Sequence, residues 1–464
     1  MSDWTIYAPA SAPGRAGVAV FRVSGPACRD VFFKFTGQHP TKPRFAYYVE
    51  LTDPVDGGAI DDALALFFQG PASFTGEDVV EFHVHGSSAV MHKLSDVLSR
   101  IPGVRLADPG EFTRRAFENG KMDLTRAEGL ADLIDAETEA QRKQALRQSR
   151  GALAVLYDGW RDRLLSQRVR VEALIDFSDQ EDVSDALSGP ARDEMYEIMR
   201  EIERHLDDGR RGERLRSGVH LAIVGPPNAG KSSLLNALSN RDAAIVSEKP
   251  GTTRDVIELR LDLGGYPVVI ADTAGIRRGA DSVEEEGVRR ARVRAAEADI
   301  CLFVYDASDP ATWEGGDAGE RTDVARKEGV HESIAPSDIA NVTRIIVFNK
   351  VDRVPGFYPP PYSGGRSVVI SLKTNEGMED LLSLLENNVR TRCESAAGPG
   401  ITRQRHRECL QATHDHLRRA LDASDLDLCA EDLRLSLNAL GRITGRVDVE
   451  DLLDVVFRDF CIGK

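Results

Sequence analysis

Residues 219–240 read VHLAIVGPPNAGKSSLLNALSN, and this segment fixes the kind of fold around it. The apolar run VHLAIV is typical of a buried strand, and SSLLNALSN has helical spacing. Between them, Gly225-Pro-Pro-Asn-Ala-Gly-Lys-Ser232 matches the pattern GxxxxGK[ST] in the strand–loop–helix context that it requires. Backbone N–H groups of such a loop point at phosphate oxygens, with the lysine on the β- and γ-phosphates and the serine on Mg²⁺. The segment predicts a phosphate site formed by Asn228, Ala229, Gly230, Lys231, Ser232 and Ser233.

Three further motifs follow in the order of a GTP-binding domain. The tetrapeptide Asp272-Thr273-Ala274-Gly275 ends the apolar run YPVVIA, where an Asp can hold the metal through water and a Gly lets the backbone approach the γ-phosphate. Asn349-Lys350-Val-Asp352 ends the run RIIVF, and its carboxylate can accept two hydrogen bonds from guanine, whose donor pair adenine lacks. Ser371-Leu-Lys373 ends the run SVVI and would close over the base. Because strands of a parallel sheet end at one ligand-binding edge, the series predicts selectivity for GTP over ATP.

The group that positions the attacking water is not where Ras-like enzymes have it. Those enzymes place a Gln directly after the glycine of the DTAG position, but Ile276 stands there in this chain. Glu284, in VEEEG, could orient water, although glutamates are equally at home at an ordinary helix start. Asn228 and carbonyls of the loop 247–252 could hold a monovalent cation that supplies positive charge, although Asn is also a common turn residue. We expect Thr253, in GTTRD, to complete the Mg²⁺ shell.

The remaining sequence predicts a multidomain protein with α/β and all-α parts. Residues 1–120 alternate short apolar runs (17–25, 61–70, 79–86) with Gly/Pro turns before a helical stretch at 87–101, which predicts a small α/β domain. Residues 121–215 carry long runs with helical spacing, the first from Leu124 to about Arg150 without a Pro. Residues 216–385 alternate strands and helices, which predicts a mainly parallel sheet, and residues 386–464 are helical again. We therefore expect a nucleotide domain inserted into a discontinuous helical domain; two independent helical domains are the alternative.

Composition excludes several classes of protein. The chain has 464 residues, 59 basic against 75 acidic, a formal charge of −16, and 41% hydrophobic residues. It is therefore neither a disordered chain nor a protein coated in basic surface, and any nucleic acid must be met through a local patch or a partner. No apolar run is long enough to span a membrane, and the start does not resemble a secretory signal. The six cysteines lie far apart without a CxxC pair, so neither disulfides nor zinc is predicted, and a reducing cytoplasm is expected.

Several segments spread over the whole chain carry a family resemblance. They are APGRAGVAVFRVSG (residues 12–25), FTGEDVVEFHVHG, DPGEFTRRAFENGKMDLTRAEGLADLI, VEALIDF and the terminal Cys461-Ile-Gly-Lys464. Together with the Asn of the phosphate loop, GTTRD and the aliphatic residue after DTAG, they resemble the MnmE (TrmE) family of potassium-activated tRNA-modification GTPases.

The resemblance implies a function that the residues alone do not. Members of that family work with MnmG, an FAD-dependent partner, to add a carboxymethylaminomethyl group at carbon 5 of the wobble uridine of certain tRNAs. The N-terminal domain binds a tetrahydrofolate derivative, 5-formyltetrahydrofolate, and forms a homodimer, which joins MnmG in a heterotetramer. A regulatory GTPase switch in ribosome or RNA metabolism, without a modification activity of its own, is the alternative that the nucleotide motifs also allow.

Site residues carry over position by position. Arg22, Glu81 and Lys121 match the folate-contacting positions, where an Arg or Lys suits carboxylates and a Glu suits the N–H groups of a pterin. Ser232 and Thr253 match the magnesium ligands, and Glu284 matches the water-orienting glutamate. The potassium site maps to Asn228 and the loop Ser247, Lys249 and Thr252, in which Lys249-Pro250 departs from the commoner small or aliphatic residues. Cys461 matches a proposed catalytic thiol and Lys464 the end of the C-terminal motif; packing beside Phe460 is the alternative for Cys461. A polar stretch between Asp306 and Thr343 looks like an insertion at the surface.

Overall fold

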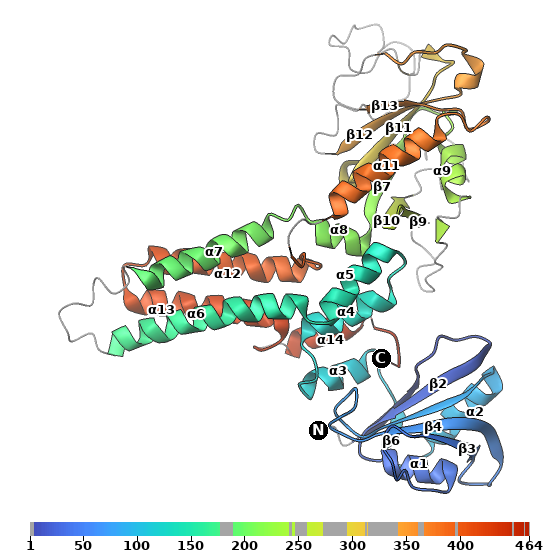
Figure 1. Cartoon of the computed structure of the whole chain (residues 1–464), viewed down its shortest axis with the longest axis vertical. Helices are drawn as coiled ribbons and strands as arrows, with labels where there is room; N and C mark the ends of the chain where they lie inside the picture. Colours follow the sequence, from blue (N-terminus) through green and yellow to red (C-terminus); the bar gives the residue numbers. More distant parts are fainter. Residues whose placement is uncertain are drawn as a thin grey trace, which may run out of the picture. The chain divides into compact units, whose positions relative to one another are not determined.

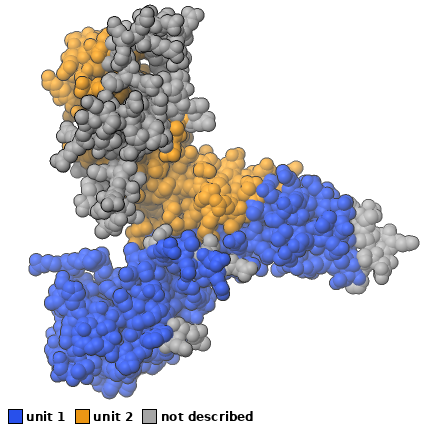
Figure 2. Space-filling model, turned by 180° about the vertical axis from the view of Figure 1, so that it is seen from behind, with its two compact units in different colours: residues 1–131, 148–198, 412–464 blue, residues 132–147, 199–411 orange. Residues whose placement is uncertain are grey.

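A computed structural model gives the fold. It describes residues 4–176, 189–240, 244–245, 258–271, 295–310, 313, 342–360, 366–394, 398–447, 450–458 and 460–463. These residues form two compact units, one of residues 1–131, 148–198 and 412–464 and the other of residues 132–147 and 199–411 (Figure 2). Each unit contains one β-sheet together with helices (Figure 1).

The first unit begins with a six-stranded sheet in the order β3-β4-β5-β2-β1-β6. Its strands are β1 (Thr5–Pro9), β2 (Ala16–Ser24), β3 (Ala46–Thr52), β4 (Ala59–Phe68), β5 (Val79–Gly86) and β6 (Val104–Leu106). All neighbours are antiparallel except β1 and β6, which are parallel. The strands predicted at 17–25, 61–70 and 79–86 are confirmed, because the alternation of buried and outward-facing residues is regular there.

Helices α1 (Cys28–Thr36) and α2 (Ser88–Ser99) cover one face of this sheet. Their side chains are buried against inward-facing residues of β2, β3, β4 and β5. Ser87 caps α2 by accepting a hydrogen bond from Val90 N, as expected for the Ser that starts the stretch 87–101. On the other face, Phe112 of α3 (Glu111–Glu118) packs with Ile6 and Ala8 of β1, while the side chains of Arg22 and Glu81 remain partly exposed. This partly exposed face is called the open face below.

Helices follow the sheet and recur at the end of the chain. They are α3 (Glu111–Glu118), α4 (Leu124–Ile134), α5 (Glu139–Ser149), α6 (Ala152–Asp176), α7 (Pro190–Leu206), α8 (Arg211–Ser217), α12 (Gln404–Asp422), α13 (Leu426–Thr444) and α14 (Glu450–Arg458). Helices α6 and α13, far apart in the sequence, pack on each other. The helical stretches therefore come from two separated segments, as predicted.

The composition of the run from Leu124 to Arg150 suggests one continuous helix, but the structure has two. It breaks between α4 and α5, where Gln141 Oε1 accepts hydrogen bonds from Glu137 N (3.1 Å) and Thr138 N (3.0 Å). Thr138 Oγ1 accepts in return from Gln141 N at 3.4 Å. This reciprocal pairing is a capping box, and it starts a new helix inside a sequence of uniformly good helix formers.

The second unit holds a seven-stranded sheet in the order β13-β12-β11-β7-β10-β9-β8. Its strands are β7 (Val219–Val224), β8 (Ala244–Ile245), β9 (Glu258–Leu263), β10 (Tyr266–Ala271), β11 (Ile300–Asp306), β12 (Thr343–Asn349) and β13 (Arg366–Val369). The predicted strands VHLAIV, YPVVIA, RIIVF and SVVI lie in β7, β10, β12 and β13, and together with β11 they pair in parallel. Strands β8 and β9, which the prediction omitted, add an antiparallel edge, and ELRLDL of β9 alternates because one face is less buried.

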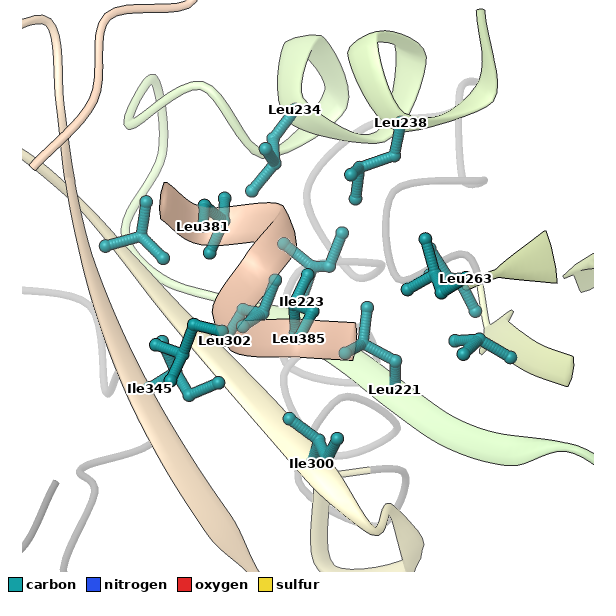
Figure 3. Close-up of a cluster of buried hydrophobic side chains, with 14 of the residues drawn as sticks. Leu221, Ile223, Leu234, Leu238, Leu263, Ile300, Leu302, Ile345, Leu381 and Leu385 are labelled. Carbon is teal, nitrogen blue, oxygen red and sulfur yellow. The ribbon is translucent and has the colours of Figure 1, made fainter. Parts of the chain in front are cut away.

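The core of this sheet explains why its central strands are continuously apolar. On one face α9 (Lys231–Ser239) and α11 (Met378–Cys393) press leucines against β7, β11 and β12 (Figure 3). On the other face a second cluster includes Cys301, Phe303 and Phe348. With both faces covered, the strand ends become the accessible edge of the sheet, which is where the predicted nucleotide motifs lie.

Candidate functional site

The phosphate loop runs from the end of β7 into α9, and its two terminal glycines cannot be replaced. Gly225 has φ +146°, and a Cβ there would lie 2.1 Å from Val304 O. Gly230 has φ +104°, and a Cβ there would lie 2.2 Å from Asn349 Nδ2. The loop is therefore packed directly against β11 and against the residue at the end of β12. Its glycines are needed for close backbone approach as well as for their dihedral angles.

Lys231, the first residue of α9, lies within the curve of the loop. Its Nζ donates hydrogen bonds to Gly225 O (2.8 Å) and Pro226 O (2.7 Å). Burial lowers the pKa of this ammonium group from its ordinary value. A bound anion would favour the charged form, so binding of a phosphate and protonation of Lys231 reinforce each other. Ser232 and Ser233 follow in the first turn of α9, where backbone N–H groups have no partner within the helix.

The structure brings the predicted base-reading loop against the phosphate loop. Asn349, which is 2% exposed, donates from Nδ2 to Ala229 O at 2.9 Å, and its Oδ1 accepts from Leu372 N at 3.3 Å. Lys350 Nζ donates to Asn228 O at 2.7 Å. The phosphate loop, the base-reading loop and the segment at Leu372 are thus joined at one edge of the sheet. In the sequence, Asn228 and Leu372 are 144 positions apart.

Asp352 and Ser371 are also in contact. Asp352 lies in the single-turn helix Val351–Arg353 and its Oδ1 accepts from Ser371 Oγ at 2.7 Å. Ser371 is fully buried, and its Oγ accepts from Thr374 N at 3.2 Å. Lys373 is exposed beside them. The carboxylate is therefore oriented by a neighbour and retains oxygen lone pairs for a ligand.

Ten predicted site residues lie outside the described ranges. They are Ser247, Lys249, Thr252, Thr253, Asp272, Thr273, Ala274, Gly275, Glu284 and Lys464.

The first unit has a second candidate site, on the open face of its sheet. Arg22 of β2 and Glu81 of β5 are directly opposite in the register, and their side chains form an ion pair at 2.9 Å. The Arg22 guanidinium also lies over the ring of Phe74, 5.4 Å from its centroid. Sequence reasoning predicted the two charged residues but not Phe74, which lies in the loop after β4.

A cleft of about 360 Å³ opens beside this pair. It is lined by Arg44, Phe68, Ala72, Ser73, Phe74, Val79, Glu81 and Lys121. Lys121 Nζ donates to Pro71 O at 2.8 Å. Two of the three predicted folate residues, Glu81 and Lys121, line the cleft, and the third, Arg22, is paired with Glu81. Aromatic rings, a carboxylate and two cations together suit a flat, polar, anionic ligand.

The loop between β4 and β5 that forms part of the cleft is held by a buried ionic network. Arg115, which is 3% exposed, donates to Glu77 Oε2 at 3.0 Å and to Glu111 Oε1 at 2.8 Å. Burial alone would raise the pKa of Glu111, but hydrogen bonds from Arg105, Asp108 N and Arg115 lower it below its ordinary value. The Glu111 carboxylate therefore stays charged at neutral pH, and the network holds the loop of the cleft in place.

The C-terminal segment is fixed by its backbone, and Cys461 is exposed. Gly110 N donates to Cys461 O at 3.4 Å, and a Cβ on Gly463 would lie 2.1 Å from Pro9 O. Phe460 is 8% exposed and Cys461 is not buried with it, so the packing interpretation of this thiol is wrong. The thiol is accessible for chemistry.

Comparisons with known proteins cover the whole chain. A family model described as the MnmE helical domain matches residues 124–461, and one described as the GTP-binding protein TrmE N-terminus matches residues 5–121. The chain is 52% identical to a tRNA modification GTPase MnmE of Parvibaculum lavamentivorans, over 99% of this chain and 100% of that protein. It is 49% identical to the protein of that name in Paramagnetospirillum magneticum, over 99% of both. It is 46% identical to the mitochondrial 5-taurinomethyluridine-[tRNA] synthase subunit GTPB3 of Danio rerio, over 100% of this chain and 93% of that one.

Proposed function

Since this chain belongs to the MnmE family and is a GTPase of tRNA modification, we propose that it helps to add a carboxymethylaminomethyl group at carbon 5 of the wobble uridine. The FAD-dependent MnmG would be its partner in this reaction. The observation that carries the proposal is the pairing of two sites in one chain: a nucleotide edge on one sheet and a charged, aromatic cleft on the other. A regulatory GTPase would need the first site alone.

In the nucleotide site, each motif has a role in binding or hydrolysis. Lys231 and the loop N–H groups bind the phosphates, Asp352 accepts from guanine, and Ser371 orients that carboxylate. Ser232 and Thr253 would hold Mg²⁺, whose charge stabilises the negative charge on the transferring phosphoryl group. Hydroxyl ligands fit this metal, which prefers oxygen.

The attacking water and the cation have their own proposed residues. Glu284 would orient the water. Asn228, with backbone carbonyls of the segment that contains Ser247, Lys249 and Thr252, would surround K⁺. The left-handed backbone of Asn228 (φ +60°) supports a special role for that position. Replacing potassium by sodium should slow hydrolysis in the wild type, and equal rates in the two salts would remove the cation from the proposal.

The cleft of the first unit would hold 5-formyltetrahydrofolate. Glu81 suits the amino and ring N–H groups of the pterin, while Lys121 and Arg44 suit the glutamate carboxylates. The rings of Phe68 and Phe74 would contact the flat pterin. Lys464 belongs to the same proposed site, and Cys461 would supply a thiol near the chemistry.

Calorimetry with 5-formyltetrahydrofolate tests the cleft. Arg22→Met keeps much of the side-chain volume but removes the partner of Glu81, and we expect affinity to fall about tenfold or more. Arg100→Met is the matched control, because Arg100 ends α2 on the covered side of the sheet and pairs with Asp96. Equal affinity in both variants would remove Arg22 from the site.

The proposed partners are a second copy of this chain, MnmG and tRNA, in the cytoplasm. The open face of the first sheet supports a homodimer, because Tyr48 (74% exposed) and Leu64 (43%) are cross-strand neighbours there and leave apolar surface uncovered. Within the described ranges, no helix combines the length and apolarity that crossing a membrane would take.

Nucleoside analysis of tRNA tests the whole proposal. Cells that lack this protein should lose the modified wobble uridine, and the wild-type gene should restore it. Lys231→Met, which removes the ammonium of the phosphate loop, should not restore it. Unchanged tRNA in the deletion strain, with GTP hydrolysis intact in the purified protein, would favour the regulatory switch.

A further inference from the structure

A carboxylate outside the nucleotide motifs lies at the point where two of them meet. Asp306 is the last residue of β11, directly beside Asn349 at the end of β12. Its Oδ2 accepts from Lys350 Nζ at 2.6 Å. Its Oδ1 accepts from Ser308 N at 2.9 Å and from Ser308 Oγ at 2.6 Å. Both oxygens therefore act as acceptors at the same time, and the side chain is 13% exposed.

Lys350 has a second partner in the phosphate loop. The same Nζ that meets Asp306 donates to Asn228 O at 2.7 Å. Lys350 (φ +67°) and Asn228 (φ +60°) both have left-handed backbones, which are sparsely populated for residues other than glycine. Two loops in uncommon conformations are thus joined through one ammonium group, and Asp306 is its anionic partner.

We propose that Asp306 is a positioning residue for guanine-nucleotide binding, which holds the Lys350 ammonium against Asn228 O and so ties the base-reading loop to the phosphate loop. The proposal rests on the nucleotide site described above. A charge-assisted hydrogen bond is stronger than a neutral one, so the carboxylate competes with water for the ammonium where a neutral group would not. Without it, Lys350 can turn to solvent, and the contact with Asn228 O is lost together with the contact to Asp306.

An amide at position 306 cannot replace the carboxylate, although it has the same shape. An amide has one acceptor oxygen and one donor nitrogen. If the oxygen stays with Ser308, the NH₂ group faces the Lys350 ammonium, and two donors oppose each other. If the amide turns round, the NH₂ group faces Ser308 N instead. Asp306→Asn should therefore break the tether with little effect on the strand, which keeps its ladder to β7 and β12.

Titration with a fluorescent GDP analogue tests the proposal in the full-length protein. Asp306→Asn should bind the analogue about tenfold more weakly and release it correspondingly faster. The preference for guanine over adenine nucleotides should not change, because Asp352 still reads the base. Asp380→Ala, in the exposed first turn of α11, is the matched control and should bind as the wild type does.

A double-mutant cycle separates positioning from a merely structural role. Lys350→Met keeps the aliphatic stem and removes the ammonium, so it should weaken binding by a similar factor. Adding Asp306→Asn to Lys350→Met should change affinity no further, since the partner is already absent. An additive loss of affinity in the double variant would overturn the proposal, as would wild-type affinity in either single variant. If Asp306→Asn does not fold, wild-type affinity in Lys350→Met still overturns the proposal.

The same experiment distinguishes this proposal from the function on which it rests. Failure of the wild type to bind any guanine nucleotide overturns the nucleotide site and the tether together. Binding by the wild type, with no loss in Asp306→Asn, overturns the tether alone.

Discussion

Arg115 shows how much a single buried cation holds in place. It joins Glu77, at the end of the loop that lines the cleft, to Glu111 of α3, and it donates to Trp4 O as well. Replacing it by Ala would leave two carboxylates without their shared partner in a largely buried position. We expect Arg115→Ala to lower the free energy of unfolding by about 3–5 kcal/mol. Urea unfolding followed by circular dichroism measures this, and a loss below about 1 kcal/mol would show that water replaces the arginine.

Glu111 gives the same network a dependence on pH. Its pKa in the folded chain is lowered from the ordinary 4.5, so its charged form is favoured by folding. The contribution is fully present above the unfolded pKa and is lost as pH falls from there through the lower folded pKa. Glu111→Gln should therefore be less stable than the wild type at about pH 7, and the difference should shrink towards about pH 3. A difference that is constant over this range would mean that shape, and not charge, matters at this position.

At single positions, the sequence predicted which residues would lie together where the pattern is local. The structure brings the phosphate-loop residues, Asn349 and Asp352 to one sheet edge, because each stands next to an apolar strand in a fixed pattern, and their roles in binding stay predictions. Asp306 was not found, although the DASD sequence that contains it also ends a strand. Its role depends on Lys350, 44 residues later, and no short pattern contains both.

At the level of elements, two helix-ending glycines look alike in the sequence and differ in the fold. Gly37 ends α1 with φ +69°, and a Cβ there would meet nothing within 4 Å. Gly445 ends α13 with φ +83°, and a Cβ there would lie 2.7 Å from Phe117 Cζ and 2.8 Å from Leu124 Cγ. Both need a left-handed backbone, but only Gly445 is also in close contact with residues of α3 and α4.

This pair predicts the effects of two matched substitutions. Gly37→Ala should lower the free energy of unfolding by about 1–2 kcal/mol, because an Ala is strained in the left-handed backbone conformation. Gly445→Ala should cost about 1–3 kcal/mol more, because Phe117 and Leu124 must move. Thermal unfolding of the two variants provides the comparison. Equal melting temperatures would mean that α13 moves away from these side chains without loss.

Element boundaries were predicted least well where the composition is uniform. The Ala, Glu, Gln and Arg residues of 124–150 all favour helix, so propensity gave no reason for a break. The capping box Thr138-x-x-Gln141 was present in the sequence and marks the start of α5. Strand β9 was not predicted because ELRLDL alternates, whereas the other long strands of this sheet are continuous apolar runs. In both cases the signal was local and could have been found.

At the scale of the molecule, the chain passes twice between helices and the seven-stranded sheet, once just before β7 and once just before α12. One carboxylate of the second unit contacts both of these connecting segments, which are called the two passages below. Asp132 Oδ1, at the end of α4, accepts from Arg216 Nε at 2.9 Å, just before β7. It also accepts from an Arg403 guanidinium nitrogen at 2.8 Å, just before α12. Gln141 Nε2 adds a bond to Arg216 O at 3.0 Å. No local pattern predicts this arrangement, because its members are 84 and 271 positions apart.

Asp132→Ala should loosen both passages and leave the sheet intact. Each arginine loses a charge-assisted hydrogen bond, worth about 1–2 kcal/mol at these partly exposed sites, which corresponds to about five- to thirtyfold easier local opening. Hydrogen–deuterium exchange should therefore accelerate in residues 211–217 and 400–403, while exchange in β11 and β12, whose strands pair without these residues, stays slow. Asp135→Ala, an exposed carboxylate on the same segment, controls for the loss of a charge. If Asp132→Ala and Asp135→Ala exchange alike, the two arginines are held by their other contacts, and the passages do not depend on a shared carboxylate.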